Sequence, residues 1–198
     1  MTAGDRHGDG LEIERKWRLT AMPEHLLRDD SGLERMRIRQ GYLALPSDRD
    51  FEAFDESGPD DVPTVGRIRS IIDPDGGRPA TFIHTLKIGS GLVRREKERP
   101  LTEGAFETAW PSTVGRRLEK VRWRVPDGGL VWEIDRFDDL SDLSTDGSSL
   151  VIAEVELPDP EGAMNLQVPP WLAGLVDREV TDDPAYNNAE IAFRTTGR

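Results

Sequence analysis

The sequence predicts a β-dominated α+β fold built on an antiparallel sheet. Eight short segments alternate polar and apolar residues with a period of two, which is typical of strands that bury one face. Turn-forming Gly and Asp residues join several of these segments, for example at 73–77, 89–91 and 127–129. Such short connections favour antiparallel pairing, because parallel strands need a crossover of about a dozen residues. Helical patterns are few and short, so helices are expected only to cover the sheet.

The predicted strands begin with residues 11–19, where Ile13 and Trp17 alternate with charged residues. The same alternation defines seven more strands, at 36–44, 64–72, 80–88, 92–101, 119–126, 130–138 and 150–157. Helical segments are expected within 23–35, from Glu103 to Trp110 after the capping residue Thr102, near 170–176, and from Asp183 to about Phe193. We expect residues 11–198 to form one domain, with a flexible N-terminus at 1–10 and a flexible acidic loop at 45–63.

Composition excludes several classes of protein. The 198 residues include 26 Lys and Arg against 38 Asp and Glu, and this net charge of −12 excludes a general electrostatic nucleic-acid binder. The chain has no cysteine, so it has no disulfide, thiolate metal site or cysteine nucleophile. It has no basic-then-apolar N-terminus and no apolar run of about 18 residues, so neither a signal peptide nor a membrane span is expected. The prediction is a cytoplasmic protein with no nucleic-acid or membrane partner.

Charged residues share one face of most predicted strands, because side chains at i and i+2 point the same way. The opposite faces carry apolar residues such as Trp17, Ile68 and Trp132. Two architectures explain this pattern. An open sheet would bury its apolar face and expose its charged face to water. A closed eight-stranded barrel would instead enclose the charges in a wet tunnel, where a polyanion and a divalent cation offset the cost of burying them. Periodicity alone leaves both possibilities open.

The order of the charged motifs resembles that of one known superfamily. Glu-Ile-Glu-Arg-Lys at 12–16 matches an E-x-E-x-K pattern, and further motifs follow in series at 39–43 (RQGYL), 67–69 (RIR), 85–87 (TLK), 94–98 (RREKE), 120–122 (KVR), 133–135 (EID), 154–156 (EVE) and 186–187 (YN). Over about residues 11–193 the series resembles the CYTH superfamily, the triphosphate tunnel metalloenzymes, and within it the small bacterial inorganic tripolyphosphatases. The resemblance implies a closed eight-stranded antiparallel β-barrel with a few covering helices.

The resemblance also implies roles for individual residues. Carboxylates would hold Mg²⁺ or Mn²⁺, cations that prefer oxygen ligands, and the candidates are Glu12, Glu14, Glu154 and Glu156, with Asp135 nearby. Basic side chains would bind the phosphates, and the candidates are Lys16, Arg39, Arg67, Arg69, Lys87, Arg122 and Arg124. The general base would be Tyr42, aided by Lys120. Because a free tyrosine has a pKa of about 10, Tyr42 would need such a cationic neighbour to act near neutral pH. The alternative is that Tyr42 is a packing aromatic at a strand end.

The implied function is divalent-metal-dependent hydrolysis of the terminal phosphoanhydride of a triphosphate. Inorganic tripolyphosphate is the favoured substrate, ahead of nucleoside or thiamine triphosphate, and the protein is expected to be a monomer or a homodimer. Two alternatives are an adenylate cyclase of the CYTH type and a non-catalytic polyphosphate- or nucleotide-binding module. The family often has basic residues beside and before its C-terminal tyrosine, whereas residues 182–188 have none. This departure argues against a phosphate contact from the C-terminal helix.

Overall fold

The computed structural model describes residues 13–28, 33–43, 63–88, 95–137, 140 and 149–194. Nine strands are present: β1 (Ile13–Leu19), β2 (Glu34–Leu43), β3 (Pro63–Ile72), β4 (Thr81–Ile88), β5 (Arg95–Pro100), β6 (Arg117–Asp127), β7 (Leu130–Phe137), β8 (Leu150–Leu157) and β9 (Val176–Glu179). The α-helices are α2 (Glu103–Ala109), α3 (Pro160–Asn165), α4 (Pro170–Ala173) and α5 (Asn188–Arg194). Short 3-10 helices are η1 (Glu24–Leu27), η2 (Trp110–Thr113) and η3 (Pro184–Tyr186).

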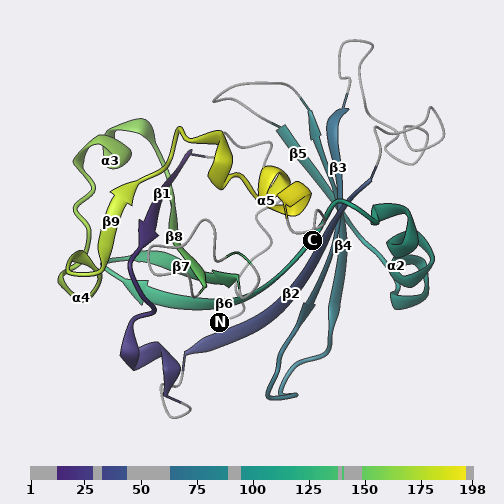
Figure 1. Cartoon of the computed structure of the whole chain (residues 1–198), viewed down its shortest axis with the longest axis horizontal. Coiled ribbons are helices and arrows are strands. Elements are labelled where there is room, and N and C mark those ends of the chain that lie inside the picture. Colours follow the sequence, from purple (N-terminus) through teal and green to yellow (C-terminus); the bar gives the residue numbers. More distant parts are fainter. Residues whose placement is uncertain are drawn as a thin grey trace.

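All nine strands form one sheet in the order β5-β4-β3-β2-β6-β7-β8-β1-β9, and every neighbouring pair is antiparallel. The eight predicted strands are therefore confirmed, and β9 is an addition. The closed eight-stranded barrel is not confirmed, because β1 uses one edge for β8 and the other for β9, so that β5 and β9 are the two edges of the described sheet. The sheet is nevertheless strongly curved and bends around α5 (Figure 1).

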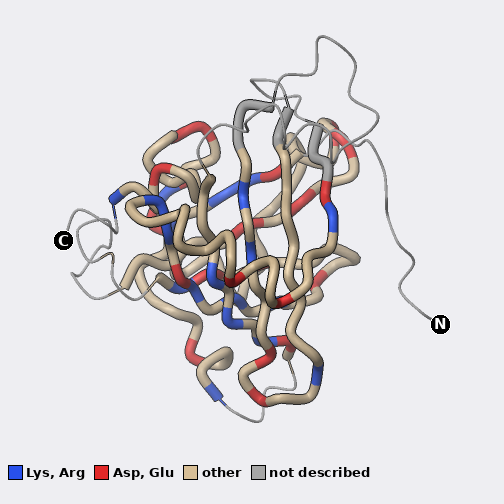
Figure 2. Tube along the Cα trace, turned by 90° about the vertical axis from the view of Figure 1, so that its right-hand side faces the viewer, with Lys and Arg blue, Asp and Glu red and all other residues tan. Residues whose placement is uncertain are grey.

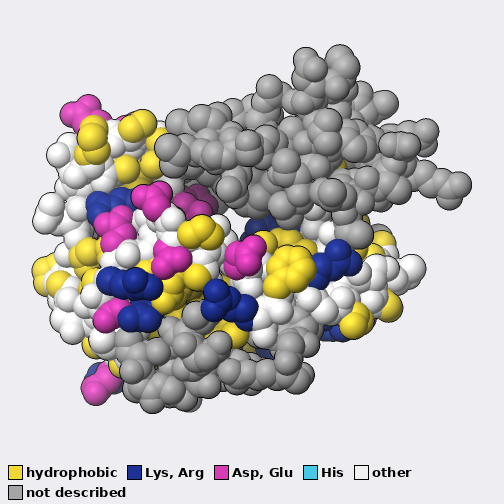
Figure 3. All heavy atoms as spheres, turned by 45° about the horizontal axis from the view of Figure 1, so that its top comes forward, with side chains coloured by type: hydrophobic (Ala, Val, Ile, Leu, Met, Phe, Trp, Pro, Cys, Tyr) yellow, Lys and Arg dark blue, Asp and Glu magenta, His cyan; other side chains and the backbone are white. Residues whose placement is uncertain are grey.

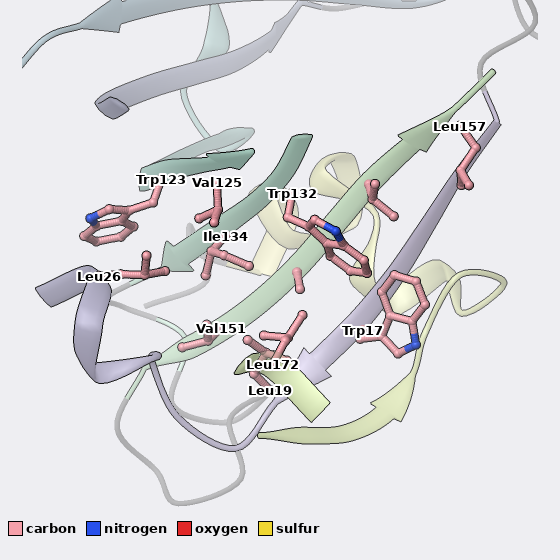
Figure 4. Packing of buried hydrophobic residues seen from close by; sticks show 12 residues of the cluster. Trp17, Leu19, Leu26, Trp123, Val125, Trp132, Ile134, Val151, Leu157 and Leu172 are labelled. Carbon is pink, nitrogen blue, oxygen red and sulfur yellow. The ribbon is translucent and has the colours of Figure 1, made fainter. Parts of the chain in front are cut away.

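The convex face of one half of the sheet is apolar and is covered by η1, α3 and α4. Trp17 of β1 and Trp132 of β7 lie there with ring centroids 5.3 Å apart, and Leu26 of η1 and Leu172 of α4 pack against the same cluster (Figure 4). Full burial of each such side chain stabilises the fold by roughly 1.5–3 kcal/mol. This cluster holds the strands in a curved wall without using their other face.

The other half of the convex face is covered by α2 and η2. Thr102 begins α2 as predicted, since its side chain accepts a hydrogen bond from the Ala105 amide at 3.2 Å. Phe106 and Trp110 stack on each other and pack against Ile68 of β3. The contact with β2 is so close at Gly41 that a Cβ there would lie 2.5 Å from the Thr113 hydroxyl.

The third group of apolar residues lies on the concave side, where η3 and α5 pack against β2, β6, β7 and β8. Tyr186 and Ile191 contribute from the C-terminal segment, and Leu118, Phe137 and Ile152 from the sheet. Figure 1 shows α5 lying over the concave side of the sheet. The rest of that face is left for polar side chains.

The expected helices are present at four places, as η1, α2, α4 and the η3–α5 pair, and α3 is an addition. The predicted flexible segments 1–10 and 45–63 lie outside the described residues, except that Pro63 begins β3. Within the described part of the chain, no helix combines the length and the apolar character that a membrane crossing requires.

Candidate active site

The charged faces of the strands turn toward one another on the concave side of the sheet. Because directly opposed residues of an antiparallel pair share a face, the register places Lys16 beside Glu154, Arg122 beside Asp135, and Arg67 beside Thr85. Acidic and basic residues therefore intersperse along the strands (Figure 2). The observed sheet turns these charged side chains toward its concave side, which we call the hollow, whereas two of the three apolar clusters lie on the convex face.

A buried ion network forms the floor of this hollow. Asp135 of β7 is completely buried; it accepts a hydrogen bond from Lys120 Nζ at 2.5 Å and two from Arg122 at 2.6 Å. Arg122 also donates to Glu154 at 3.0 Å and to Glu133. Burial would raise the pKa of Asp135, but Arg122 and Lys120 outweigh it and lower that pKa to about 2. Asp135 is thus an ionised counter-ion whose two oxygens are already occupied by cations.

Lys16 joins the first strand to this network. Its ammonium lies 2.9 Å from Glu14 and 3.6 Å from Glu154. Burial would lower the pKa of Lys16, but the two carboxylates outweigh burial and raise it, so the side chain keeps its charge at neutral pH. A buried, permanently charged ammonium is suited to binding an anion.

The arginines of β3 face the network from across the hollow. Glu98 of β5 lies 3.5 Å from Arg67 and 3.7 Å from Arg69, and it accepts a hydrogen bond from the Thr85 hydroxyl at 2.9 Å. Burial and the adjacent Arg67 lower the pKa of Arg69 to about 10. The Arg69 Nε is buried without a hydrogen-bond partner among the described residues. Because buried donors normally have partners, this group has the capacity to bind an acceptor such as a phosphate oxygen.

Tyr42 lies next to these arginines on the concave side and is buried. Its hydroxyl accepts a hydrogen bond from Gln40 Nε2 at 2.6 Å. Burial raises the pKa of Tyr42 to about 12, despite the opposing effect of Arg67 and the Gln40 hydrogen bond. The phenol is therefore protonated at neutral pH. It packs within the apolar group on the concave side that includes Tyr186 and Ile191.

Lys120, the predicted partner of Tyr42, lies instead in the floor network. Besides Asp135, its ammonium donates to Asn188 of α5 at 3.3 Å. Burial and the neighbouring Arg122 lower the pKa of Lys120, although Asp135 opposes them.

Two other predicted phosphate ligands lie away from the buried network. Arg39 lies on the convex face, where its guanidinium is 4.5 Å from the ring centroid of Trp110 and 3.3 Å from Glu107. Arg124 lies on the concave face but at a more exposed position, 3.0 Å from Glu34 and 3.4 Å from Glu133. The side chain of Lys87 and the whole of Glu12 fall outside the described part.

Three carboxylates, those of Glu14, Glu133 and Glu156, lie at the exposed end of the network, where Glu14 pairs with Lys16 and Glu133 pairs with Arg122 and Arg124. Glu14 is opposite Glu156, and Glu133 is opposite Glu154 on the next strand. The pKa of Glu156 is raised by burial and by the negative charges of Glu133 and Glu14. Among the described residues, no group of three acidic side chains is already arranged as a metal site. A divalent cation would relieve the repulsion between these carboxylates, and carboxylate oxygens are the chemical type of ligand that Mg²⁺ and Mn²⁺ prefer.

Sequence reasoning missed two contributions to this site. Glu133 belongs to the charged motif at 133–135 and shares a face with Asp135, but the sequence prediction gave a role to Asp135 alone. The second is a pair of arginines at the C-terminal tyrosine: Arg18 and Arg178 donate to the Tyr186 hydroxyl at 3.1 and 3.2 Å. Arg178 belongs to β9, which the sequence did not predict. The segment 182–188 lacks basic residues, but its tyrosine is bound by arginines from elsewhere.

Comparison with known proteins identifies the family. No family model matches the chain. The inorganic triphosphatase of Nitrosomonas europaea is 32% identical over 184 residues, which are 92% of this chain and 97% of that protein. The chain belongs to the inorganic triphosphatase family. The inorganic triphosphatase of Acetivibrio thermocellus is 36% identical over 74 residues, 37% of this chain and 40% of that protein. A crystal structure of an inorganic triphosphatase superposes with a TM-score of 0.55 at 29% identity, covering 92% of this chain and 94% of that one.

Membership of the inorganic triphosphatase family agrees with the resemblance to the CYTH superfamily that the motif series indicated. Across the exposed face of this family member, basic and acidic side chains lie next to one another rather than in separate patches (Figure 3). Cations at the centre of the hollow and carboxylates at its exposed end form an arrangement that can bind a highly charged anion together with a cation.

Proposed function

We propose that this protein hydrolyses the terminal phosphoanhydride of a triphosphate, with inorganic tripolyphosphate as the favoured substrate, in the presence of Mg²⁺ or Mn²⁺. The observation that supports this most strongly is the convergence of buried cations from β1, β3 and β6 on one concave face. Burying so many charges is costly unless counter-ions or a ligand offset them. A triphosphate supplies the negative charge, and the named relatives are inorganic triphosphatases.

In this proposal the concave face is the tunnel, and its cations bind and orient the phosphate chain. Lys16, Arg67, Arg69 and Arg122 would contact phosphate oxygens, and Lys87 would add to them from β4. Asp135 holds Arg122 in a fixed position through two hydrogen bonds. Because phosphoryl transfer passes through a transition state with charge spread over several oxygens, fixed cations lower its energy mainly by electrostatic stabilisation.

The carboxylates at the exposed end would hold the metal ion. Glu14, Glu133 and Glu156 are the described candidates, with Glu154 adjacent and Glu12 as a further candidate from the first strand. When bound, a divalent cation would neutralise phosphate charge and polarise the scissile group. Asp135 is not part of this set in our proposal, because its carboxylate is completely buried in the floor network between Lys120 and Arg122, whereas Glu133 is partly exposed.

We propose that Tyr42 and Lys120 position the substrate rather than remove a proton. A tyrosine with a pKa of about 12 has almost no phenolate at neutral pH. The Lys120 ammonium is engaged by Asp135 and Asn188. Little proton transfer by the protein is needed in this chemistry, because positioning and electrostatics supply most of the catalysis. Cytoplasmic location and a monomeric or dimeric state remain predictions.

The test is a phosphate-release panel with tripolyphosphate, ATP and thiamine triphosphate, each with Mg²⁺ and with Mn²⁺. We expect metal-dependent release, fastest from tripolyphosphate. Glu14→Gln should lose most of the turnover with little change in melting temperature, because it removes a carboxylate from the exposed end. Glu24→Gln, on the exposed part of η1 across the convex face, is the matched control and should behave like the wild type.

Three results would contradict the proposal. Full activity of Glu14→Gln would remove Glu14 from the metal set. Formation of cyclic AMP from ATP, without phosphate release from tripolyphosphate, would assign the protein as a cyclase. Tight binding of tripolyphosphate without turnover with either metal would assign it as a binding module.

A further inference from the structure

At the exposed end of the concave face, arginines and carboxylates of three separate elements meet at Glu34. Glu34 is the first residue of β2. It shares the concave face with Arg124 of β6, because the two residues are opposite each other in register. Its carboxylate accepts a hydrogen bond from Arg124 Nη1 at 3.0 Å. Arg78, in the turn between β3 and β4, reaches the same carboxylate and donates to its other oxygen. Figure 1 shows this turn as the long β3–β4 hairpin that extends toward the start of β2.

The position of these arginines distinguishes them from the cations deeper in the hollow. The side chains of Arg78 and Arg124 are 48% and 41% exposed, whereas those of Lys120 and Arg122 are 2% and 10% exposed. Exposure therefore increases from the floor network toward Arg124 and Arg78. A phosphate chain bound at the floor would extend toward these two arginines only if it were long enough.

In the structure, carboxylates pair with the two guanidinium groups that a longer polyphosphate would need. Arg124 is shared by Glu34 and Glu133, and its Nε is buried without a hydrogen-bond partner among the described residues. Arg78 is shared by Glu34 and Asp73, with its Nε 3.3 Å from Asp73. Burial would raise the pKa of Glu34, but its bonds with Arg78 and Arg124 outweigh burial and lower the pKa, so the carboxylate is ionised at neutral pH. Glu34 is the one carboxylate of this group that binds both arginines.

We propose that Glu34 determines chain-length specificity: by holding Arg78 and Arg124, it closes a further phosphate subsite at the exposed end of the hollow. The inference rests on the proposed function, since it assumes that polyphosphate binds to the concave face. A phosphate beyond the third meets an ionised carboxylate instead of two available guanidinium groups. Tripolyphosphate is held by the deeper cations and is little affected, whereas tetrapolyphosphate is disfavoured.

The test compares the binding of tripolyphosphate and tetrapolyphosphate to Glu34→Gln by titration calorimetry, in chelator and at low salt, so that no hydrolysis is needed. Gln keeps the shape of Glu34 but removes its charge. We expect the affinity for tetrapolyphosphate to rise about fivefold, as expected for one partly exposed charge interaction, with little change for tripolyphosphate. The gain should shrink as salt is added. Adding Arg78→Ala to Glu34→Gln should remove most of the gain.

Glu119→Gln is the matched control, because Glu119 is also paired with arginines, Arg37 and Arg39, but lies on the convex face. It changes the net charge equally and should not alter the preference for chain length. A gain in Glu34→Gln no larger than in Glu119→Gln, or equal gains for the two chains, would overturn the inference. If the wild type binds tripolyphosphate without hydrolysing it, the proposed catalytic function fails while the comparison of chain lengths still decides the role of Glu34. If none of the proteins binds either chain, both fail.

Discussion

Replacing Asp135 tests the ion network on which the hollow depends. Asp135→Asn keeps the size of the side chain but removes the negative charge that faces Lys120 and Arg122 at 2.5 and 2.6 Å. Since Asp135 is completely buried, water cannot take over its role. The two cations would then repel each other in a poorly hydrated site, and we expect a large loss of stability.

The magnitude follows in two steps. Lowering the carboxyl pKa from 3.8 to about 2 on folding contributes on the order of 2–3 kcal/mol to stability at neutral pH. Breaking a buried pair by removing one partner also leaves the other charge uncompensated, and the total cost is typically about 3–5 kcal/mol. We therefore expect Asp135→Asn to lower the free energy of unfolding by about 3–5 kcal/mol. Adding Lys120→Met to this variant should restore part of the loss, because it removes one of the uncompensated cations.

The assay is urea unfolding at neutral pH, followed by tryptophan fluorescence. Because the folded-state pKa is the lower one, the stability from Asp135 is present above its unfolded pKa and disappears as the pH falls toward about 2. The difference between wild type and variant should thus be constant near neutral pH and shrink only in strong acid. Asp75→Asn, which removes an exposed partner of Arg35, is the control and should change little. A loss below about 1 kcal/mol in Asp135→Asn would refute the network as a stabilising element.

Two further outcomes can be measured directly. Gly41→Ala should destabilise the fold by about 1–3 kcal/mol, because its Cβ would lie within 2.5–2.7 Å of three Thr113 atoms. Adding Thr113→Gly to this variant should recover the melting temperature. An unchanged melting temperature in Gly41→Ala alone would contradict the close contact. Tyr42→Phe should leave the pH dependence of phosphate release around neutral pH unchanged, since the phenol has a pKa of about 12 and is already protonated. Loss of the rise in rate with increasing pH, which deprotonation of a general base produces, would instead restore Tyr42 as the base.

Alternation in the sequence predicted the strands and their charged faces because period-two patterns are a property of each strand alone. The same rule places Arg39 away from Tyr42: the two are three residues apart, so a regular strand puts them on opposite faces, as the structure shows. Applying the rule before the family resemblance would have separated them. Spacing also pairs Glu133 with Asp135.

Other features depend on contacts that no local pattern contains. The four residues of β9 are mostly exposed and carry no alternation that identifies a strand, since pairing with β1 defines it. Because β9 was missed, the open edge of the sheet and the contact of Arg178 with Tyr186 were missed as well. The pKa of Tyr42 likewise depends on its burial under the C-terminal segment, which the sequence does not state.

Because the hollow is lined by a single sheet, neighbouring residues of each strand have different roles: one packs in the outer apolar cluster and the next faces the hollow. In β8, Val151, Ala153 and Val155 belong to the outer apolar cluster, while Glu154 and Glu156 face inward. A substitution at an inward position can therefore alter what is recognised while the outward neighbours continue to maintain the shape. Descendants of one such scaffold can exchange one polyanionic ligand for another through a few inward changes, without rebuilding the surrounding architecture.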